Sequence, residues 1–422
     1  MSGADSDGVA DLVVAGAGPA GVFAAIRCRE LAPAARVIVL ERGREPLRKV
    51  LISGGGRCNV TNVRTDPREL ATFYPRGGRE LMGPFSRFGP AETVAWFARH
   101  GVELRAQPDG RLFPVTDSSR TVVDALLRAA GDAGVELRLG CGLRSAVRAA
   151  LLGNDGGFVL ETDAGSLRSR ALLLATGGGS GNAGWTAAAD LGHTVAPPVP
   201  SLFTFRCRDP RLRDLAGIAF TDAEVRLAGT RHRHRGPLLV THDGLSGPAV
   251  LLLSAWSARE LHALDYRFDV LVDWIPAVTE PAVGEALAAA RRDHPRRQVR
   301  TLAPVVLPQR LWESLVDGTG LPDGRIWAEL TRDETATLID DLKRTHLSID
   351  GQSPFKEEFV TCGGVALREV DPRTFASRLV PGLYFAGELL DVDGVTGGFN
   401  FQGCWTTGWL AGSAAASHLH AQ

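Results

Sequence analysis

A glycine-rich turn near the start of the chain is the feature that most restricts its fold. The apolar segment DLVVA at residues 11–15 is followed by GAGPAG, which fits the pattern G-x-G-x-x-G, and residues 22–29 then have the composition of a helix. In a dinucleotide-binding unit the first glycine, Gly16, permits a tight turn, Gly18 lets a pyrophosphate approach the backbone, and Gly21 lets helix and strand pack closely. The order strand, turn and helix therefore predicts such a unit.

An acidic residue follows at the offset that this unit requires. A second predicted strand, residues 36–40, ends in Glu41, which is 20 residues beyond Gly21. A carboxylate in this position binds ribose hydroxyls, and the helix N-terminus supplies amide donors and a partial positive charge for the phosphates. The glycine pattern alone is a weak signal because glycine turns are common. Together with the strand, the helix and the acid, it predicts a bound adenine dinucleotide.

Three further segments have the composition of cofactor-binding loops. Residues 48–62, RKVLISGGGRCNVTN, contain a glycine triplet that leaves backbone amides bare beside Arg57, whose guanidinium can face a phosphate or an electron-rich ring. Residues 171–179, ALLLATGGG, read as a buried strand that ends in Ala-Thr-Gly-Gly. Residues 382–412 read as a strand, an acidic turn and a glycine-rich entry into a final helix.

In their order and spacing, these four segments resemble the YhiN/BaiN-like (HI0933-like) family of FAD-dependent oxidoreductases, within the two-dinucleotide-fold flavoproteins. The resemblance covers nearly the whole chain, and it is most specific at SGGGRCNVTN, THDGLSGP, TCGGVALREVDPRTFASRLVPGLYFAGELLDVDG and TGGFNFQ. It implies an α/β fold with a discontinuous, Rossmann-like FAD-binding domain. We expect this domain to comprise residues 1–196 and 353–422. Residues 197–352 are expected to form an inserted β-barrel-like domain with a helical subdomain at about 277–345.

The resemblance also implies which residues hold FAD, without a covalent link. Those expected at the ADP half are Gly16, Gly18, Pro19, Ala20, Gly21, Glu41 and Arg42. Those expected near the pyrophosphate and isoalloxazine are Arg48, Lys49, Gly55, Gly56, Arg57, Cys58 and Asn59, with Thr176 and Gly177 where the chain returns to the cofactor. Those expected at the ribityl–phosphate stretch are Gly387, Glu388 and Asp391, and those at the pyrimidine edge are Gly397, Gly398, Asn400 and Gln402.

The final helix adds a physical reason for the last assignment. It is predicted to begin after Gly398, so its free amides would face the flavin N1–O2 edge, which becomes negative on reduction. Glu388 stands where many flavoproteins carry Asp, and its longer side chain can still reach a hydroxyl, so we treat it as a variant.

A second stretch, residues 179–184, also fits G-x-G-x-x-G and raises the question of an NAD(P)H site. The stretch overlaps the end of the strand at 171–179, and it runs on into a proline cluster at 197–200 instead of a strand that ends in an acid. We therefore interpret it as a false match. NAD(P)H is expected to act as a transient reductant over the flavin, or a separate reductase is expected to supply the electrons.

Two residues are candidates for the chemistry besides the flavin. Reduction of a conjugated double bond needs a proton donor, and His242 lies in a turn of the insert that is expected to cover the flavin. A histidine hydrogen-bonded within its own turn is an equally good interpretation of His242. Cys58 is the one cysteine inside a flavin motif, but nothing in the sequence indicates that its thiol is activated.

Composition limits the partners and the compartment. Lys and Arg number 47 against 48 Asp and Glu, so no chain-wide positive field exists to hold RNA, and RNA binding would need a local patch. The arginines of the insert that offer such a patch are Arg231, Arg233, Arg235, Arg291, Arg292, Arg296, Arg297 and Arg300. The six cysteines form no C-x-x-C pair, and no apolar run approaches the roughly 20 residues of a membrane helix. We expect a cytoplasmic protein without membrane or metal sites.

Known members of the family reduce carbon–carbon double bonds conjugated to a carbonyl, on a steroid-type acid or on uridine in ribosomal RNA. The resemblance therefore implies a flavin oxidoreductase, and we favour a small-molecule substrate because charge runs on helices are usually solvated faces. The alternatives are a ribosomal RNA dihydrouridine synthase-like enzyme and a flavin-binding sensor or RNA-associated module without turnover.

Overall fold

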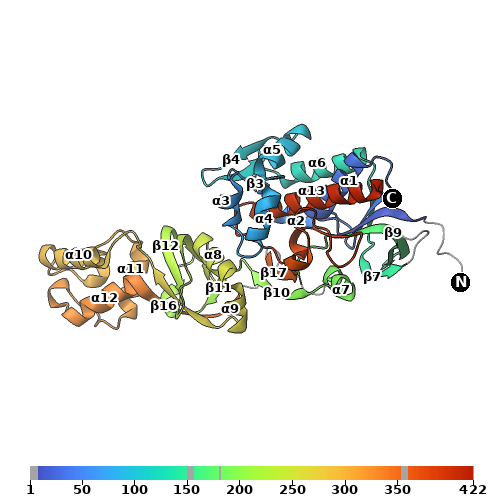
Figure 1. Ribbon diagram of the computed structural model, residues 1–422. Coiled ribbons are helices and arrows are strands. Elements are labelled where there is room, and N and C mark those ends of the chain that lie inside the picture. Colours follow the sequence, from blue (N-terminus) through green and yellow to red (C-terminus); the bar gives the residue numbers. More distant parts are fainter. Residues whose placement is uncertain (1–7, 150–155, 180–181, 353–359, 422) are drawn as a thin grey trace. The chain divides into compact units, whose positions relative to one another are not determined.

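The computed structural model describes residues 8–149, 156–179, 182–352 and 360–421. The chain divides into two compact units (Figure 1). Unit 1 comprises residues 1–199 and 360–422, and unit 2 comprises residues 200–359.

The centre of unit 1 is a mixed, seven-stranded sheet. Its strands, in spatial order, are β6 (Glu136–Leu139), β2 (Val37–Glu41), β1 (Ala10–Ala15), β9 (Gly165–Leu174), β8 (Gly157–Thr162) and β7 (Leu143–Ala149), and β18 (Leu383–Phe385) also pairs with β9. The pairs that join β6, β2, β1, β9 and β18 are parallel, and those that join β9, β8 and β7 are antiparallel. Strands β1, β2 and β18 and the second half of β9 are almost fully buried, as expected for the centre of a sheet with both faces covered, whereas β6 at the edge is only partly buried.

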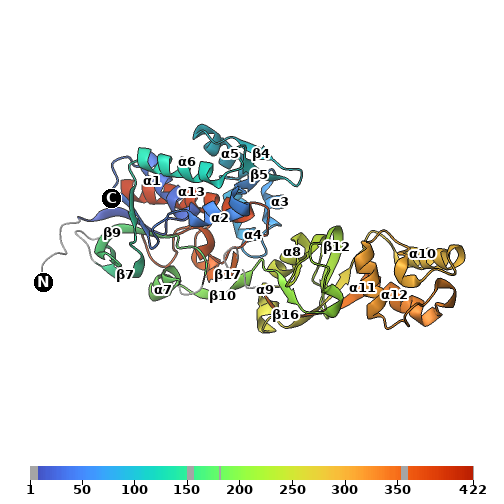
Figure 2. The same cartoon turned by 180° about the vertical axis from the view of Figure 1, so that it is seen from behind.

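Two helices from opposite ends of the chain pack against each other in unit 1. Helix α1 (Pro19–Leu31) and helix α13 (Phe399–His420) run side by side in both views (Figures 1 and 2). A Cβ added at Gly408 would lie 2.5 Å from the carbonyl oxygen of Ala20, and one added at Gly412 would lie 2.3 Å from that of Ala24. These two glycines are therefore what allows the helix backbones to approach closely.

Smaller elements complete unit 1. Its other strands are β3 (Thr61–Asn62), β4 (Leu104–Ala106) and β5 (Arg111–Pro114), which form one sheet, and β10 (Val195–Ser201) and β17 (Val360–Val365), which form another. Its other α-helices are α2 (Arg48–Gly56), α3 (Pro67–Ala71), α4 (Gly78–Phe85), α5 (Pro90–Arg99), α6 (Ser119–Asp132) and α7 (Ala183–Asp190). Single 3-10 turns cover Leu367–Glu369 and Gly387–Leu389.

Unit 2 contains a closed, six-stranded antiparallel barrel. The strands, in spatial order, are β11 (Phe205–Cys207), β14 (Gly244–Ser246), β13 (Arg233–Val240), β12 (Ala219–Leu227), β15 (Phe268–Asp273) and β16 (Thr345–Gln352). Its helices are α8 (Pro248–Trp256), α9 (Ala258–Ala263), α10 (Glu280–Asp293), α11 (Gln309–Gly318) and α12 (Arg332–Arg344), with 3-10 turns at Pro210–Leu212, Val299–Thr301 and Trp327–Glu329. Three buried tryptophans, Trp274, Trp312 and Trp327, contribute to the hydrophobic core of this unit.

The predicted fold class is confirmed: a Rossmann-like α/β domain is interrupted by a β-barrel and helices. Across the described ranges, no helix is long and apolar enough to cross a membrane.

Candidate functional site

The first glycine pattern forms the turn between β1 and α1. Gly16 has a φ of 110°, and a Cβ on it would lie 2.4 Å from the carbonyl oxygen of Ala175, while a Cβ on Gly21 would lie 2.0 Å from the carbonyl oxygen of Gly16. A Cβ on Gly18, in contrast, would meet nothing within 4 Å. Gly16 and Gly21 thus serve backbone packing, whereas Gly18 borders open space in front of the helix N-terminus, where a pyrophosphate would fit.

Glu41, at the end of β2, holds this turn. Its Oε2 accepts a hydrogen bond from the Ala17 amide at 3.1 Å, and its Oε1 accepts one from the Gly43 amide at 2.7 Å. The Leu47 amide donates to the Ala17 carbonyl at 2.9 Å. The fingerprint turn and the segment leading to α2 are therefore connected at Ala17, which places the Glu41 carboxylate beside the predicted ADP half of the site.

The glycine triplet is part of a broken helix and not a simple loop. Helix α2 loses helical geometry at Ser53, and Gly54 and Gly55 have φ angles of 57° and 68°. A Cβ on Gly55 or Gly56 would meet nothing within 4 Å, and both residues are exposed. The sequence correctly indicates a bare backbone here, and the structure adds the break in the helix that exposes it.

Asn59 joins the triplet to α13. With the Asn59 amide oriented so that its oxygen faces the Gly398 amide, it accepts a hydrogen bond from that amide at 2.7 Å and donates one to the Thr61 carbonyl at 3.0 Å. The Asn62 side chain donates to the Gly397 carbonyl at 2.9 Å. Two motifs that are more than 300 residues apart are thereby fixed to each other.

Arg57 and Cys58 lie in different environments. The Arg57 guanidinium lies over the Phe113 ring, 4.5 Å from its centroid. Cys58 is buried, and burial raises the pKa of its thiol to about 12 even though a hydrogen bond with Ser53 lowers it. A thiol of this kind stays neutral near pH 7, so the structure argues against Cys58 as a thiolate nucleophile.

Glu388 is the point where four segments of unit 1 meet. Its Oε2 lies 2.5 Å from Lys49 Nζ and accepts a hydrogen bond from the Gly178 amide at 3.2 Å, while its Oε1 accepts one from the Thr361 amide at 2.8 Å. Although burial alone lowers it, the charge and hydrogen bond of Glu388 raise the pKa of Lys49 above its usual value. Thr361 was not among the residues predicted from the sequence, because its contact is made by its backbone.

The return of the chain after β9 is fixed by Asn182. Its Oδ1 accepts hydrogen bonds from Thr176 Oγ1 at 2.5 Å and from the Gly184 amide at 2.9 Å, and its side-chain nitrogen donates to the Gly177 carbonyl. A Cβ on Gly184 would lie 2.1 Å from Thr176 Oγ1. The side chains of Thr176 and Asn182 are therefore engaged within the protein, and the next strand, β10, pairs with β17 outside the main sheet. Gly181 of the second glycine pattern lies outside the described residues.

Helix α13 begins where the sequence predicts. Gly398 has a φ of 87° and precedes the first residue of the helix, and no side chain caps this end. A Cβ on Gly398 would lie 2.5 Å from the Thr61 carbonyl oxygen, so only glycine fits. Asn400 accepts a hydrogen bond from the Gly394 amide at 2.8 Å and donates to its carbonyl at 2.7 Å, which closes the preceding loop.

The side chain of Gln402 differs from expectation. It is fully buried, and its Oε1 accepts hydrogen bonds from Thr61 Oγ1 at 2.6 Å and Thr93 Oγ1 at 3.0 Å, while its Nε2 donates to Thr406 Oγ1 at 3.0 Å. Its side chain is therefore engaged inside the protein and supports the start of α13 from behind. The motif TGGFNFQ indicates that Gln402 lies near the expected flavin site, but it does not indicate which way the side chain points.

The remaining predicted residues are placed as follows. Pro19 and Ala20 begin α1, and a Cβ on Gly387 would lie 2.8 Å from the Ala20 Cβ, so the first and last motifs are packed together. Arg42 and Arg48 are exposed, and Asp391 is half-buried. Arg76 forms an ion pair with the fully buried Asp393, which belongs to the acidic turn DVDG. The sequence indicates this acidic turn but not its partner Arg76.

His242 belongs to unit 2. It is exposed in the turn between β13 and β14, and this turn is closed by a hydrogen bond of 2.7 Å from the Thr241 amide to the Gly244 carbonyl. His232 Nε2 lies 3.5 Å from Glu260 Oε1. Within the described ranges, no group of three or more His, Cys, Asp or Glu side chains is arranged to bind a metal ion.

Unit 1 thus presents the features of a dinucleotide-binding flavoprotein. Open space at Gly18, the carboxylate of Glu41, the bare backbone of Gly55 and Gly56, and the uncapped start of α13 fit the pyrophosphate, ribose and ring of FAD.

Comparison with known proteins agrees with this class. Residues 10–414 match the HI0933-like protein Rossmann domain. The chain is 33% identical over 411 residues to the ribosomal RNA dihydrouridine synthase of Escherichia coli (strain K12), covering 94% of this chain and 96% of that protein. It is 30% identical over 412 residues to the 3-dehydro-bile acid delta(4,6)-reductase of Clostridium scindens, covering 96% and 98%. The structure of 3-ketosteroid delta1-dehydrogenase from Sterolibacterium denitrificans is similar in fold, with a TM-score of 0.51 and 12% identity over 97% of this chain and 99% of that one.

The chain belongs to the HI0933-like family, and it is an FAD-dependent oxidoreductase by that membership. The resemblance inferred from the sequence is confirmed. The use of NAD(P)H, the roles of individual residues and the partners remain predictions.

Proposed function

We propose that this protein reduces a carbon–carbon double bond conjugated to a carbonyl group. The observation that carries the proposal is that two relatives of nearly full-length coverage are named for reductions of this kind on very different substrates, a bile acid and a uridine base. FAD, when bound, supplies the hydride chemistry. The reaction class is therefore what this chain is expected to share with both relatives.

The chain's own residues bind and orient the cofactor in this proposal. The amides around Gly18 hold the pyrophosphate, and Glu41 accepts hydrogen bonds from the ribose. The free amides at the start of α13 stabilise negative charge on the pyrimidine edge of the ring. Asn59 and Asn62 keep that helix end in position through Gly398 and Gly397.

We favour a small-molecule substrate because of the charges on unit 2. Residues 200–359 carry 21 Lys and Arg against 23 Asp and Glu, so this unit has no net positive charge. Several of its arginines are also neutralised by carboxylates: Arg235 pairs with Asp222 at 2.6 Å, and Arg300 pairs with Asp317 at 2.8 Å. A polyanion would therefore meet no net positive charge over this unit as a whole.

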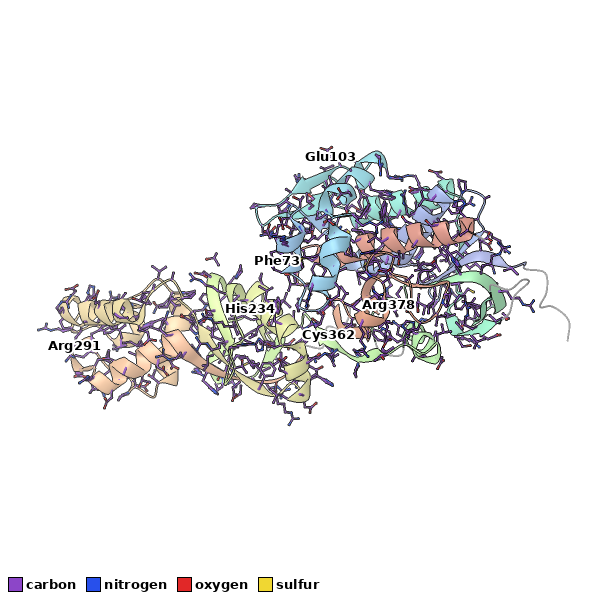
Figure 3. The ribbon with its side chains drawn as sticks, viewed as in Figure 1. Phe73, Glu103, His234, Arg291, Cys362 and Arg378 are labelled. Atoms are coloured by element: carbon purple, nitrogen blue, oxygen red, sulfur yellow. The ribbon has the colours of Figure 1, made fainter. Side chains whose placement is uncertain are left out.

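A ribosomal RNA substrate is the second candidate, and the relative from Escherichia coli supports it. Arg291 lies on α10, in the helical part of unit 2 (Figure 3), and its guanidinium donates to the Ala328 carbonyl. Its exposed neighbours Arg292, Arg296 and Arg297 make this the densest cationic stretch of the chain.

Electrons are proposed to come from NAD(P)H that binds transiently, or from a separate reductase. His242 is the proposed proton donor, since its exposed imidazole is of a residue type that acts as a general acid in catalysis.

The reaction class and the substrate are tested together in single-turnover experiments. The FAD-loaded protein is reduced with light and EDTA under anaerobic conditions, and it is then mixed with a conjugated steroid enone or with a uridine-containing ribosomal RNA fragment. Reoxidation by the enone, insensitive to salt between 50 and 200 mM, is the expected result. Reoxidation by RNA alone, falling by orders of magnitude over about this salt range, would establish the second candidate. Absence of reoxidation by either would contradict the proposed reaction.

The arginine stretch supplies a separate test of the substrate. Replacement of Arg291, Arg292, Arg296, Arg297 and Arg300 by Gln should leave enone reduction unchanged. The same protein would lose RNA-dependent turnover, with a normal FAD spectrum, if RNA were the substrate.

A further inference from the structure

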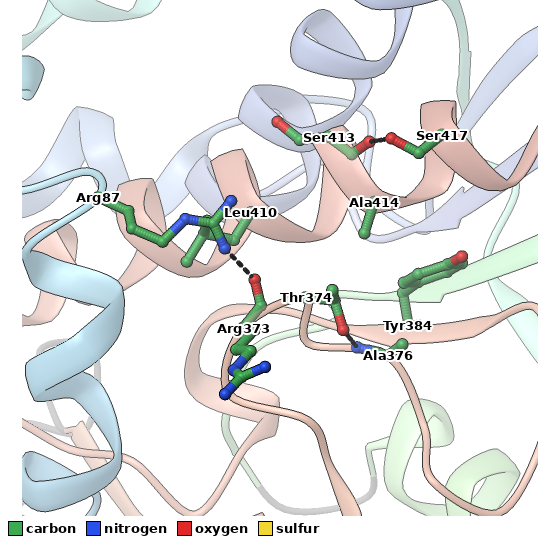
Figure 4. Close-up of a pocket in the computed structure, with 9 residues that line it drawn as sticks. All are labelled: Arg87, Arg373, Thr374, Ala376, Tyr384, Leu410, Ser413, Ala414 and Ser417. Atoms are coloured by element: carbon green, nitrogen blue, oxygen red, sulfur yellow. Dashed lines mark hydrogen bonds between the residues drawn. The ribbon is translucent and has the colours of Figure 1, made fainter.

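A pocket of about 280 Å³ lies beside the C-terminal half of α13 in unit 1 (Figure 4). Its lining residues are Arg87, Arg373, Thr374, Ala376, Tyr384, Leu410, Ser413, Ala414 and Ser417. Leu410 is ten residues beyond Asn400 on the same helix, which corresponds to about 15 Å along the axis. The pocket is therefore separate from the flavin-binding end of α13.

The pocket exists because small side chains of α13 face a tyrosine. Ser413, Ala414 and Ser417 lie within about one helical turn of one another, so three small residues of α13 leave space above the helix beside Leu410. Tyr384 forms another part of the lining. It is 4% exposed, and burial raises its pKa to about 12, so its side chain stays neutral. These walls suit the apolar body of a small molecule.

The rim of the pocket is cationic. The Arg87 guanidinium donates a hydrogen bond of 2.6 Å to the Arg373 carbonyl, which holds the two arginine residues together (Figure 4). In the part of the chain that the structure describes, neither guanidinium makes an ion pair with a carboxylate. Asp371, two residues before Arg373, accepts a hydrogen bond from the Arg373 backbone amide at 3.0 Å. Arg87 and Arg373 thus border an apolar pocket, and among the described residues no carboxylate neutralises either side chain.

We propose that this pocket binds a small organic anion, with its anionic head at Arg87 and its apolar body against Leu410, Ala414 and Tyr384. A guanidinium with four N–H groups to spare can grip a carboxylate or a sulfonate. The Thr374 hydroxyl, whose oxygen accepts from the Ala376 amide at 3.3 Å, keeps its proton for a ligand oxygen. The inference does not depend on the substrate proposed above, because none of the individual residues expected to hold FAD lines the pocket.

Isothermal titration of the FAD-loaded protein with octanoate tests the proposal, with octan-1-ol as the uncharged probe of the same length. Octanoate should bind at least tenfold more tightly than the alcohol. Arg87→Gln should weaken octanoate binding about tenfold, since it removes the charge-assisted hydrogen bonds to the carboxylate. Ala414→Phe should abolish binding by filling the pocket. Arg99→Gln, which removes an exposed arginine outside the pocket, should bind octanoate as the wild type does.

The flavin absorbance spectrum and circular dichroism confirm that each variant is folded. Should Ala414→Phe fail to fold, Ser417→Trp fills the pocket from an exposed position. Octanoate binding that survives the filling variant, or equal binding of octanoate and octanol, would overturn the proposal. So would the absence of octanoate binding at millimolar concentration.

Discussion

Lys49 and Glu388 are 339 residues apart in the chain, yet Lys49 Nζ lies 2.5 Å from Glu388 Oε2. The Glu388 side chain is 14% exposed, whereas that of Lys49 is 51% exposed. The carboxylate also accepts hydrogen bonds from the backbone amides of Gly178 and Thr361. Glu388 therefore connects the backbone segments at Gly178 and Thr361. Lys49 adds an ion pair to this carboxylate from the solvent-exposed side.

This difference predicts unequal effects of two substitutions. Glu388→Ala leaves two amides without their acceptor and should lower the free energy of unfolding by about 1–3 kcal/mol, with weaker FAD binding. Lys49→Met removes a half-exposed ion pair and should cost below about 1 kcal/mol. Urea denaturation and FAD titration of both variants measure this. A larger loss in Lys49→Met than in Glu388→Ala would show that the ion pair, not the backbone contacts, holds the site.

The two glycines Gly18 and Gly21 should respond differently to added side chains. Gly18→Val places its side chain in open space, so the apoprotein should stay folded while the pyrophosphate is blocked and FAD is lost. In Gly21→Ala the new Cβ would lie 2.0 Å from the Gly16 carbonyl oxygen, so the fold itself should be destabilised. Thermal unfolding of the apoproteins and the bound FAD content distinguish the two. Full FAD occupancy in Gly18→Val would refute the assignment of this motif.

Much of this site could be predicted because its signals are local. Gly16, Gly21 and Gly398 stand where a Cβ would collide with backbone atoms, and Gly18 leaves open space for the cofactor, so these positions can be recognised from the glycine pattern of the sequence. The direction of a side chain is different, since it depends on partners far away in the chain. Gln402 points to Thr61 and Thr93, more than 300 residues earlier, and nothing in its local sequence specifies this.

Hydrogen bonds made by backbone groups also cannot be predicted from residue types. Thr361 contributes its amide to Glu388, and any residue except proline would provide the same group. The Arg76–Asp393 ion pair required knowledge of which loops meet, although a buried Asp393 could be expected to have a cation beside it. The break of α2 at Ser53 lies directly before two glycines with positive φ, but the contacts of Asn59 that join the triplet to Gly398 involve a partner more than 300 residues away.

Cys58 is predicted to be chemically silent. Since burial raises the pKa of its thiol to about 12, the native protein should not be alkylated by iodoacetamide at this residue at pH 8. All six cysteines should react once the chain is unfolded in urea, which is the control. Cys58→Ala should keep turnover within about twofold of wild type. Rapid alkylation of native Cys58, located by mass spectrometry, would contradict its neutral, buried state.

His193 predicts a pH dependence of stability. Its side chain is buried, with Nε2 2.8 Å from Ser377 Oγ and Nδ1 3.4 Å from Glu369. Burial lowers the pKa of His193 below 6.5, although Glu369 opposes this. The unfolded chain therefore takes up this proton at a higher pH than the folded protein does. The contribution of neutral His193 to the free energy of unfolding is therefore fully present above pH 6.5. It is lost as the pH falls from 6.5 through the lower pKa that His193 has in the folded protein.

Substitution separates this effect from other titrations. His193→Gln should flatten the dependence of the urea midpoint on pH below 6.5, because its side chain carries no titrating proton. His420→Gln, an exposed histidine of the same unit, should retain the wild-type slope. An unchanged slope in His193→Gln would assign the pH dependence to other groups.

His242, the proposed proton donor, can be tested by substitution. Hydride and proton are delivered to different carbons of the double bond, so loss of the acid should slow substrate-dependent reoxidation of the flavin without affecting its reduction. His242→Ala should therefore lower the reoxidation rate by about 10²–10⁴-fold and leave flavin reduction by NADPH or dithionite unchanged. His346→Ala, another exposed histidine of unit 2, is the matched control and should leave both rates as in the wild type. Stopped-flow absorbance of the flavin follows each half-reaction separately. If both rates stay unchanged in His242→Ala, the residue is only part of the turn that Thr241 and Gly244 close, and another acid delivers the proton.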